Sequence, residues 1–326
     1  MKLRDKVSPP KTESLAAGVL EGEGGSALWE RLNRYSKAKK RAMANIDVLS
    51  VFGNNPITTK RCLSAKAKLC DCGNYLKFNH YYTVNETRLG AANFCKQHLL
   101  CPLCAIRRSS KALGEYLKRY EVIRKENPDW RLSMITVTVA NGPDLEERFN
   151  HLTKGIKVVM DRRRDWLKKG RGKTEWRKVH GWVGSYEVTN IGNGWHPHVH
   201  IMTVHSESYT YKAMNQEWLD VTGDSHVINV KPIFNRKNPT DGFMEIFKYA
   251  MKFSSLSPEE NVHAWNVLRG RRLQFSGGCF RGVKVPEDLT DQPLDGLPYI
   301  EMLFQYFASG YVHINSEHKE PEHIET

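Results

Sequence analysis

The chain has 326 residues, and its 49 lysines and arginines exceed its 36 aspartates and glutamates, so its formal net charge is +13. Apolar residues make up 40% of it, which is enough for a hydrophobic core and excludes a chain that is disordered throughout. No apolar run approaches the roughly 18 residues of a membrane span, and no apolar segment follows the basic N-terminus. We therefore expect a cytoplasmic protein, and its charge favours an anionic partner, nucleic acid first.

Hydrophobic spacing and turn residues divide the chain into expected elements. Residues 190–194 contain two glycines and would join two strands in a hairpin. The order strand-helix-strand-strand-helix-strand predicts an α+β fold with an antiparallel sheet and helices on one face. We expect helices over 28–46, 144–169, 209–219, 243–253 and 258–268, strands over 131–139, 181–189, 195–204 and 226–233, and a hairpin over 271–285.

Three histidines alternate along the expected strand 195–204. His196, His198 and His200 point to the same face, because side chains alternate along a strand. Three imidazoles on a buried face are costly without partners, and a divalent metal is the simplest partner. Glu187 lies on the preceding strand, where a cross-strand neighbour is about 5 Å away, so it could bind the same ion. Two histidines and a carboxylate suit Mg²⁺ or Mn²⁺.

Other interpretations of these residues stay open. His196 competes with Glu187 for the third ligand position. Glu187 could instead be a surface carboxylate, and the three histidines could form a solvated polar face.

The expected helix 243–253 carries a tyrosine beside a carboxylate. Glu245 and Tyr249 are spaced i and i+4, so they share one helix face. A tyrosine next to a carboxylate can act as an oxygen nucleophile. Lys248 and Lys252 have the same spacing and could hold phosphates. Alone, this pattern equally fits a tyrosine that packs in the core.

Cysteines cluster between residues 70 and 104. Without an export signal we expect thiols, and clustered thiols favour a metal over disulfides. A tight Cys-x-x-Cys pair is typical of zinc sites, and four thiolates would close a structural Zn²⁺ site that has no open position. Cys70 and His98 are alternative ligands, and buried cysteines without a metal are the other interpretation. The preferred ligands are Cys72, Cys95, Cys101 and Cys104.

A strongly basic stretch covers residues 161–178. Trp166 and Trp176 lie among its cations, a mixture that suits single-stranded DNA. A solvated loop and helix end is the alternative interpretation. A second basic group between Arg269 and Lys284 could complete a groove. The candidates for phosphate contacts are Arg162, Arg163, Arg164, Lys168, Lys169 and Arg171.

Four segments of the chain are informative together. The first is Met134–Asn141, a strand that ends near Asn. The second is Glu187–Thr189 together with His196–Met202. The third is the Glu-x-x-Lys-Tyr-x-x-Lys sequence of 245–252, and the fourth is the cysteine-containing segment Phe94–Arg108. Together they resemble the HUH endonuclease superfamily, and within it the replication initiators of rolling-circle plasmids that use a single tyrosine. The resemblance covers about residues 60–285.

The resemblance implies the HUH endonuclease fold, a central antiparallel sheet flanked by helices, with an N-terminal zinc-binding module. It implies that Tyr249 attacks one strand of the plasmid origin, stays linked to the 5′-phosphate and releases a 3′-OH primer. Glu245 would activate water at termination, because Phe253 stands where two-tyrosine relatives have their second nucleophile. The implied partners are origin DNA, single-stranded or as a cruciform, a host helicase and a single-strand-binding protein.

The expected organisation has four parts. A flexible or helical segment covers 1–60, the zinc-binding module 61–115, the catalytic nicking domain 125–290, and a C-terminal helix with a polar tail 291–326. A single-strand transposase or relaxase is an alternative, although a relaxase usually carries its tyrosine before the histidine motif. A non-catalytic zinc-containing nucleic-acid-binding protein is the alternative from another class.

Overall fold

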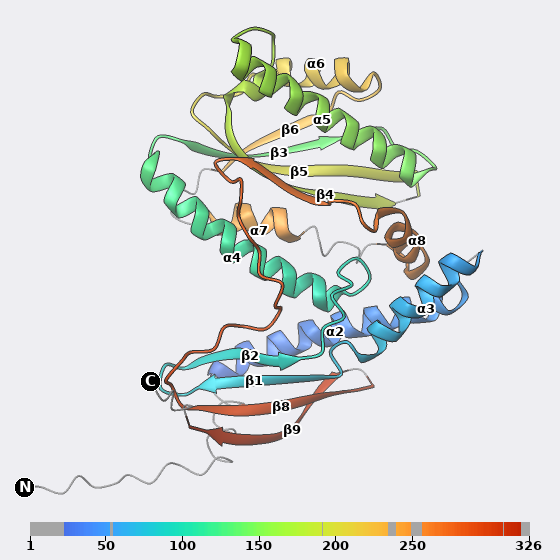
Figure 1. Cartoon of the computed structure of the whole chain (residues 1–326), viewed down its shortest axis with the longest axis vertical. Coiled ribbons are helices and arrows are strands. Elements are labelled where there is room, and N and C mark those ends of the chain that lie inside the picture. The colour runs from blue at the N-terminus through green and yellow to red at the C-terminus, as the bar shows by residue number, and fades with distance from the viewer. Residues whose placement is uncertain are drawn as a thin grey trace, which may run out of the picture. The chain divides into compact units, whose positions relative to one another are not determined.

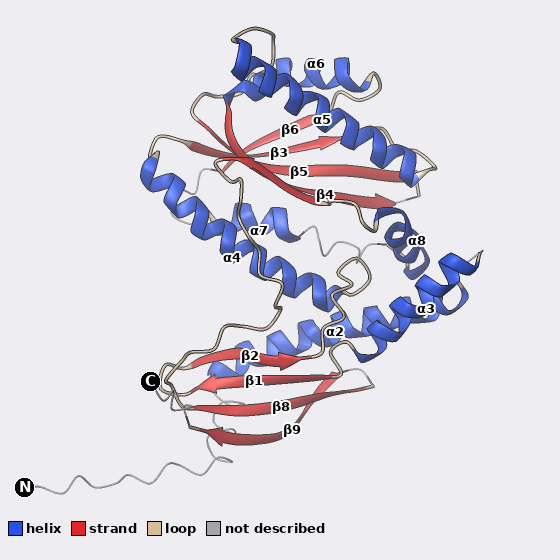
Figure 2. Cartoon of the chain, viewed as in Figure 1, coloured by secondary structure: helices blue, strands red, loops and turns tan. Residues whose placement is uncertain are grey.

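A computed structural model describes residues 23–52, 55–190, 192–233, 239–248, 256–308 and 310–320. The chain forms two compact units (Figure 1), which we call the first unit, Met1–Gln97 with Asp288–Thr326, and the second unit, His98–Glu287. Each unit contains one antiparallel sheet, and helices accompany both sheets (Figure 2). In the part of the chain that the structure describes, no helix is both long and apolar enough to cross a membrane.

The first unit combines two hairpins that are far apart in the sequence. Its sheet has the order β2-β1-β8-β9. One sheet face is buried through alternate residues, among them Leu76, Phe78 and Phe304. Trp29 meets Phe304 edge to face at 6.2 Å, so the first helix packs on that face. The elements are α2 (Glu23–Val51), α3 (Pro56–Asp71), β1 (Tyr75–Tyr81), β2 (Glu86–Ala92), β8 (Tyr299–Phe307) and β9 (Gly310–Lys319).

The prediction of a C-terminal helix within 291–326 is wrong. Residues 299–319 form β8 and β9, in which Ile300, Met302 and Phe304 are buried at a period of two. This period belongs to a strand and not to a helix. The boundaries of the compact units also differ from the four expected parts, because the C-terminal strands complete the sheet that β1 and β2 begin.

The second unit has a five-stranded sheet in the order β6-β3-β5-β4-β7. Its elements follow most of the expected ones closely, including α5 and α8, whose boundaries lie within a residue of the predictions. They are α4 (Pro102–Glu126), β3 (Arg131–Thr138), α5 (Leu145–Lys169), the 3-10 helix η1 (Glu175–Lys178), β4 (Val179–Asn190), β5 (Trp195–His205), α6 (Tyr211–Thr222), β6 (Ile228–Ile233), α7 (Thr240–Lys248), α8 (Pro258–Leu268) and β7 (Gln274–Gly278).

Helices cover both faces of this sheet, as Figure 1 shows, so the expectation of helices on one face is wrong. On one face, Val199 and Ile201 pack with residues of α5 and α6 such as Ile156 and Trp218. On the other face, Met202 and Val204 pack with residues of α4 and α7. The helices on this second face include α4, which precedes β3 in the chain and packs against the sheet.

The hairpin predicted over 271–285 is also wrong. This segment supplies a single strand, β7, which pairs with β4 so that Gln274 lies opposite Ser185. After β7 the chain turns at Gly278, whose φ of 59° favours glycine. β7 therefore extends the central sheet and forms no hairpin of its own.

Candidate functional site

The β4–β5 hairpin sets the position of the central polar group. Its register places Glu187 opposite His198, and Ser185 opposite His200. The hairpin loop requires glycine at position 194, where φ is 86° and a Cβ atom would lie 2.7 Å from the carbonyl oxygen of Gly142. This close approach fixes the start of β5, and with it the register that brings the acidic and imidazole groups together.

Glu187, His198 and His200 form a buried group, called here the EHH group. Oε2 of Glu187 lies 2.9 Å from Nε2 of His198 and 3.4 Å from Nε2 of His200. The three residues are 3%, 9% and 7% exposed. A carboxylate removed from water needs positive charge close by. One carboxylate oxygen and two imidazole nitrogens within 4.8 Å of one another could hold a metal ion.

Neighbouring groups orient the two imidazoles for this purpose. Nδ1 of His198 lies 3.4 Å from the carbonyl oxygen of His196, and Nδ1 of His200 lies 2.9 Å from Oγ1 of Thr136 on β3. A carbonyl oxygen only accepts, so a proton on Nδ1 of His198 would leave Nε2 free to bind a metal ion that Glu187 also holds. Such outer contacts are typical of histidine ligands.

His196 occupies a different place from the other two histidines. Its Nδ1 lies 2.5 Å from Oδ1 of Asn141, and the residue is not part of the EHH group. Burial, together with the neighbouring His198, lowers the pKa of His196. The geometry therefore groups Glu187, and not His196, with His198 and His200. The sequence did not reveal that Thr136 contacts His200 or that Asn141 contacts His196, although both residues lie in the segment 134–141.

The expected tyrosine helix begins on the same face of the sheet. Phe243, Ile246 and Phe247 of α7 are buried against Val183 and Met202. Strand alternation puts these two sheet residues on the face of the EHH group. Glu245 and Lys248 belong to α7, but their side chains lie outside what the structure describes. Tyr249, Lys252 and Phe253 lie outside the described residues.

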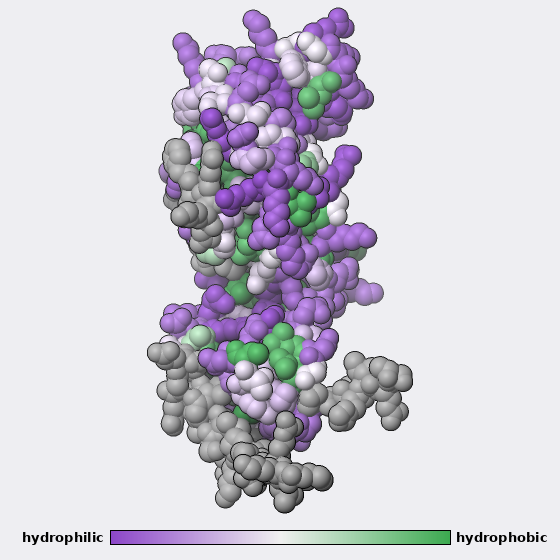
Figure 3. Space-filling model, turned by 90° about the vertical axis from the view of Figure 1, so that its left-hand side faces the viewer, coloured by the Kyte–Doolittle hydropathy of each residue, from purple (hydrophilic) through white to green (hydrophobic). Residues whose placement is uncertain are grey.

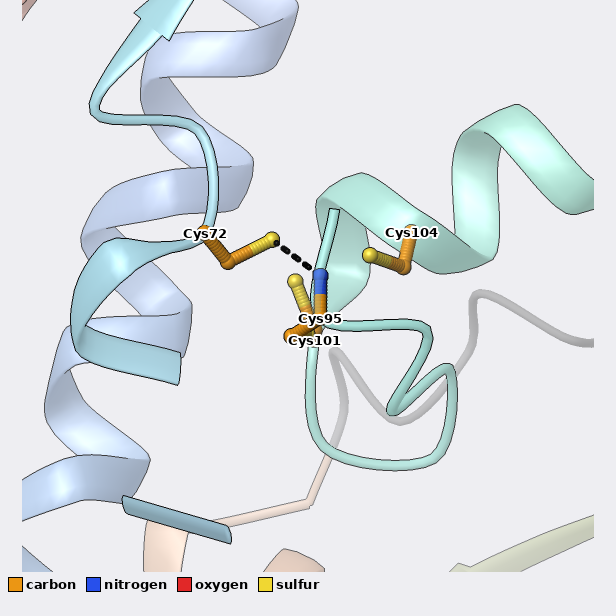
Figure 4. A group of neighbouring side chains, drawn as sticks. All are labelled: Cys72, Cys95, Cys101 and Cys104. Atoms are coloured by element: carbon orange, nitrogen blue, oxygen red, sulfur yellow. Dashed lines mark hydrogen bonds between the residues drawn. The ribbon is translucent and has the colours of Figure 1, made fainter. Parts of the chain in front are cut away.

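Four thiols form a second group, drawn in Figure 4. The sulfur atoms of Cys72, Cys95, Cys101 and Cys104 lie within 4.8 Å of one another and could hold a metal ion. The backbone N–H of Cys95 donates to Sγ of Cys72 at 3.3 Å. Cys101 and Cys104 lie at the start of α4, where the helix dipole favours thiolates. Cys70 is exposed, and neither it nor His98 belongs to this group.

A buried lysine that the sequence did not reveal holds the loop around Cys72. Nζ of Lys39, on α2, donates to the carbonyl oxygens of Cys70 at 3.0 Å and Cys72 at 2.6 Å. It also donates to Oδ1 of Asn74 at 2.9 Å, and the residue is 3% exposed. Nothing in the spacing of basic residues along α2 distinguishes Lys39 from the exposed lysines of the same helix.

The cations predicted to contact phosphates lie on α5 or just after it. α5 packs on the sheet face opposite the EHH group, because it contacts Val199 and Ile201. Hydrophilic residues predominate on the face of the molecule that Figure 3 shows. Lys168, Lys169 and Arg171 are exposed. They could meet phosphates on that side of the sheet.

Three of the predicted cations have partners within the protein. Arg163 donates from Nε to the carbonyl oxygen of Val179 at 2.9 Å, and burial lowers its pKa. Arg162 lies 3.6 Å from the buried Glu217, and Arg164 pairs with Asp161 at 2.8 Å. Trp176, expected among the DNA-facing aromatics, is fully buried in the core and cannot stack on a base.

A cavity of about 400 Å³ lies beside β4. Its lining includes Ser185, the neighbour of His200, and three arginines, Arg108, Arg271 and Arg272. No acidic residue lines it among those the structure describes. Arg271 also bonds to Asn150 on α5, whereas Arg272 is exposed. Arg108 and Arg272 give the lining positive charge, whereas Arg271 is also paired with Glu146 of α5.

Comparison with known proteins identifies the family. Residues 86–299 match the protein family described as "Replication protein". The chain is 28% identical over 195 residues to "Protein rep" of Staphylococcus aureus, covering 56% of this chain and 80% of that protein. It is 27% identical over 247 residues to "Protein rep" of Streptococcus pneumoniae serotype 2, covering 70% and 73%. No solved structure matches the chain. Because the family match spans more than half of the sequence, the chain belongs to the replication protein family.

Proposed function

We propose that this protein is a plasmid replication initiator of the HUH type, which nicks and rejoins origin DNA through a single tyrosine. The observation that carries the proposal is the EHH group, buried on the sheet face against which α7 packs. Tyr249 follows the last residue of α7 in the sequence. The EHH group and α7 therefore lie on the same face of the sheet.

The chemistry requires charge stabilisation at the phosphate. A divalent ion held by Glu187, His198 and His200 would supply positive charge to a non-bridging oxygen of the scissile phosphate. Tyr249 gives up its phenolic proton to solvent and attacks phosphorus, forming the bond from its oxygen to the 5′-phosphate while the bond to the 3′-oxygen breaks. The 3′-oxygen takes a proton and becomes the primer end. Glu245 later accepts a proton from the water that releases the strand.

The four-thiol group has a different role. Four sulfur ligands suit Zn²⁺ in a closed structural site, so we assign no chemistry to it. The scissile strand enters along the cavity that Arg108 and Arg272 line, where their guanidinium groups hold phosphates. A host helicase and a single-strand-binding protein would act on the primer end and the displaced strand.

A covalent adduct tests the proposal. The full chain is incubated with single-stranded oligonucleotides from its plasmid origin and Mn²⁺, and the products are separated on denaturing gels. We expect a protein–DNA adduct that survives SDS, and its loss in Tyr249→Phe. Tyr82→Phe, which removes a hydroxyl from the first unit, is the matched control and keeps the adduct. An adduct that persists in Tyr249→Phe refutes the assignment of the nucleophile.

A further inference from the structure

The second unit contains a larger cavity, which the proposed cleavage does not use. Its volume is about 640 Å³, and it lies where β3 begins and β5 ends, since Arg131 and His205 both line it and pair with each other. His205 follows His200 by five positions on β5. At about 3.3 Å per residue, the cavity lies roughly 17 Å along the strand from the EHH group, and side-chain alternation puts His205 on the opposite face of the sheet.

Aromatic rings form much of the cavity wall. Trp130 stacks on His180 with ring centroids 4.1 Å apart and planes 10° apart. The hydroxyl of Tyr209 donates to Oγ1 of Thr203 at 2.9 Å. These contacts fix two of the rings. Tyr211, at the start of α6, is 53% exposed and leaves a ring face accessible. A nucleobase stacks on such a surface whatever its identity.

A polar wall complements the rings. Nδ1 of His205 lies 2.8 Å from the carbonyl oxygen of Glu207, and because that oxygen only accepts, the proton is on Nδ1. Burial lowers the pKa of His205, which favours the neutral ring. Nε2 then accepts from the hydroxyl of Ser133 at 2.8 Å. The oxygen of Ser133 retains acceptor capacity for an amino group on the edge of a base.

The charge around the cavity suits phosphates that flank such a base. Arg131 is exposed at the cavity, where its Nη1 donates to Oγ of Ser208 at 3.2 Å. No acidic residue lines the cavity among the described residues. The C-terminal part of α5 reaches the same end of the sheet, because Arg163 donates to the carbonyl oxygen of Val179, which pairs with His205.

We propose that this cavity binds one unpaired nucleobase of single-stranded DNA, with Tyr211 stacking on the base and Arg131 holding an adjacent phosphate. The inference rests on the proposed function for its single-stranded substrate. It adds a base-binding site that is separate from the cleavage chemistry, and it gives the cations at the end of α5 a strand to contact.

The test separates bases from phosphates. Fluorescence anisotropy measures the affinity of the full chain, without added divalent ion, for a single-stranded oligonucleotide of mixed sequence and for a fully abasic strand of equal length. We expect the wild type to prefer the base-containing strand. Tyr211→Ala should reduce this preference by about fivefold or more, as expected for one lost base stack. Tyr211→Phe keeps the ring and should retain the preference.

Two further variants complete the design. Arg131→Ala should weaken binding to both strands to a similar extent, since it removes a phosphate contact. Phe307→Ala removes a ring of similar exposure, 50%, from the first unit and should change neither affinity. An unchanged preference in Tyr211→Ala overturns the inference. The measurement involves no cleavage, so failure of Tyr249 as nucleophile would show in the adduct assay and leave this preference unaffected.

Discussion

Glu187 and His198 face each other across the β4–β5 register, and Oε2 of the carboxylate lies 2.9 Å from Nε2 of the imidazole. Both atoms are ones that a divalent ion would use. The hairpin register therefore determines whether Glu187 and His198 can bind the same ion, because a register shift of one residue would send the carboxylate to the opposite face.

Replacing the carboxylate tests this link. Glu187→Gln keeps the size of the side chain but removes the negative charge, so we expect Mn²⁺-dependent nicking to fall by at least about tenfold. Glu121→Gln changes an exposed carboxylate on α4 and should have no effect. The measurement is the initial nicking rate as a function of Mn²⁺ concentration. Equal rates in Glu187→Gln and wild type would show that Glu187 is not a ligand.

Thr136 acts through His200 and offers a finer test. Thr136→Val keeps the shape of the side chain but removes the oxygen that lies 2.9 Å from Nδ1 of His200. Loss of such an outer contact lowers metal affinity by about 10- to 100-fold. The Mn²⁺ concentration for half-maximal nicking should rise accordingly, while the rate at saturating Mn²⁺ changes less. A lower saturated rate with unchanged Mn²⁺ dependence would contradict a role in positioning.

The zinc content of variants can distinguish the residues of the four-thiol group from their neighbour Cys70. Cys72→Ser should lose zinc in elemental analysis of the purified protein, because it removes one of four converging sulfurs. Cys70→Ser is the matched control, and it should retain zinc because Cys70 is exposed and outside the group. Zinc loss in Cys70→Ser and retention in Cys72→Ser would reverse the assignment.

Lys39 should stabilise the loop that carries Cys72. In Lys39→Met the carbonyl oxygens of Cys70 and Cys72 lose a charged donor in a buried place. We expect the free energy of unfolding to fall by about 2 kcal/mol or more. Lys37→Met alters an exposed lysine of the same helix and should change it little. Urea denaturation measures both variants, and equal stabilities would exclude the proposed anchoring.

Stability should also depend on pH through buried histidines. Burial lowers the pKa of His80, which is 4% exposed, so the unfolded chain binds this proton more readily than the folded chain. The contribution of His80 to the free energy of unfolding is then complete above the unfolded pKa of about 6.5, and it is lost as the pH falls below that value. His80→Gln should make this decrease shallower, whereas His226→Gln, at an exposed position, should not. Urea denaturation at pH 7 and pH 5 gives the slopes.

The local pattern predicted the central elements of the second unit and, in the first unit, the helix over 28–46 that forms part of α2, but not the sheet of the first unit. The alternation of His196 to His200 and the turn before it were enough to place β4 and β5, because register in a hairpin is a local property. The sheet of the first unit joins β1 to β8, which pairs Leu76 with Phe304. A pairing between segments so distant in the sequence leaves no local signal.

The candidate site was predictable to a similar degree. Alternation along the histidine strand and the position of Glu187 on the preceding strand favoured Glu187, His198 and His200 as neighbours, with His196 as an alternative. The clustering of cysteines favoured the four thiols that the structure groups, with Cys70 and His98 as alternatives. The contact of Thr136 with His200 depends on the β3–β5 register, and the burial of Lys39 depends on how α2 packs. Such contacts arise from tertiary packing, which the spacing of residues does not encode.

The most direct measurement identifies the residue that carries the DNA. The SDS-stable adduct is digested with a protease and a nuclease, and the nucleotide-linked peptide is sequenced by mass spectrometry. The proposed function predicts that the 5′-phosphate is attached to Tyr249. Attachment to any other residue, or recovery of cleaved DNA with no linked peptide, would contradict it.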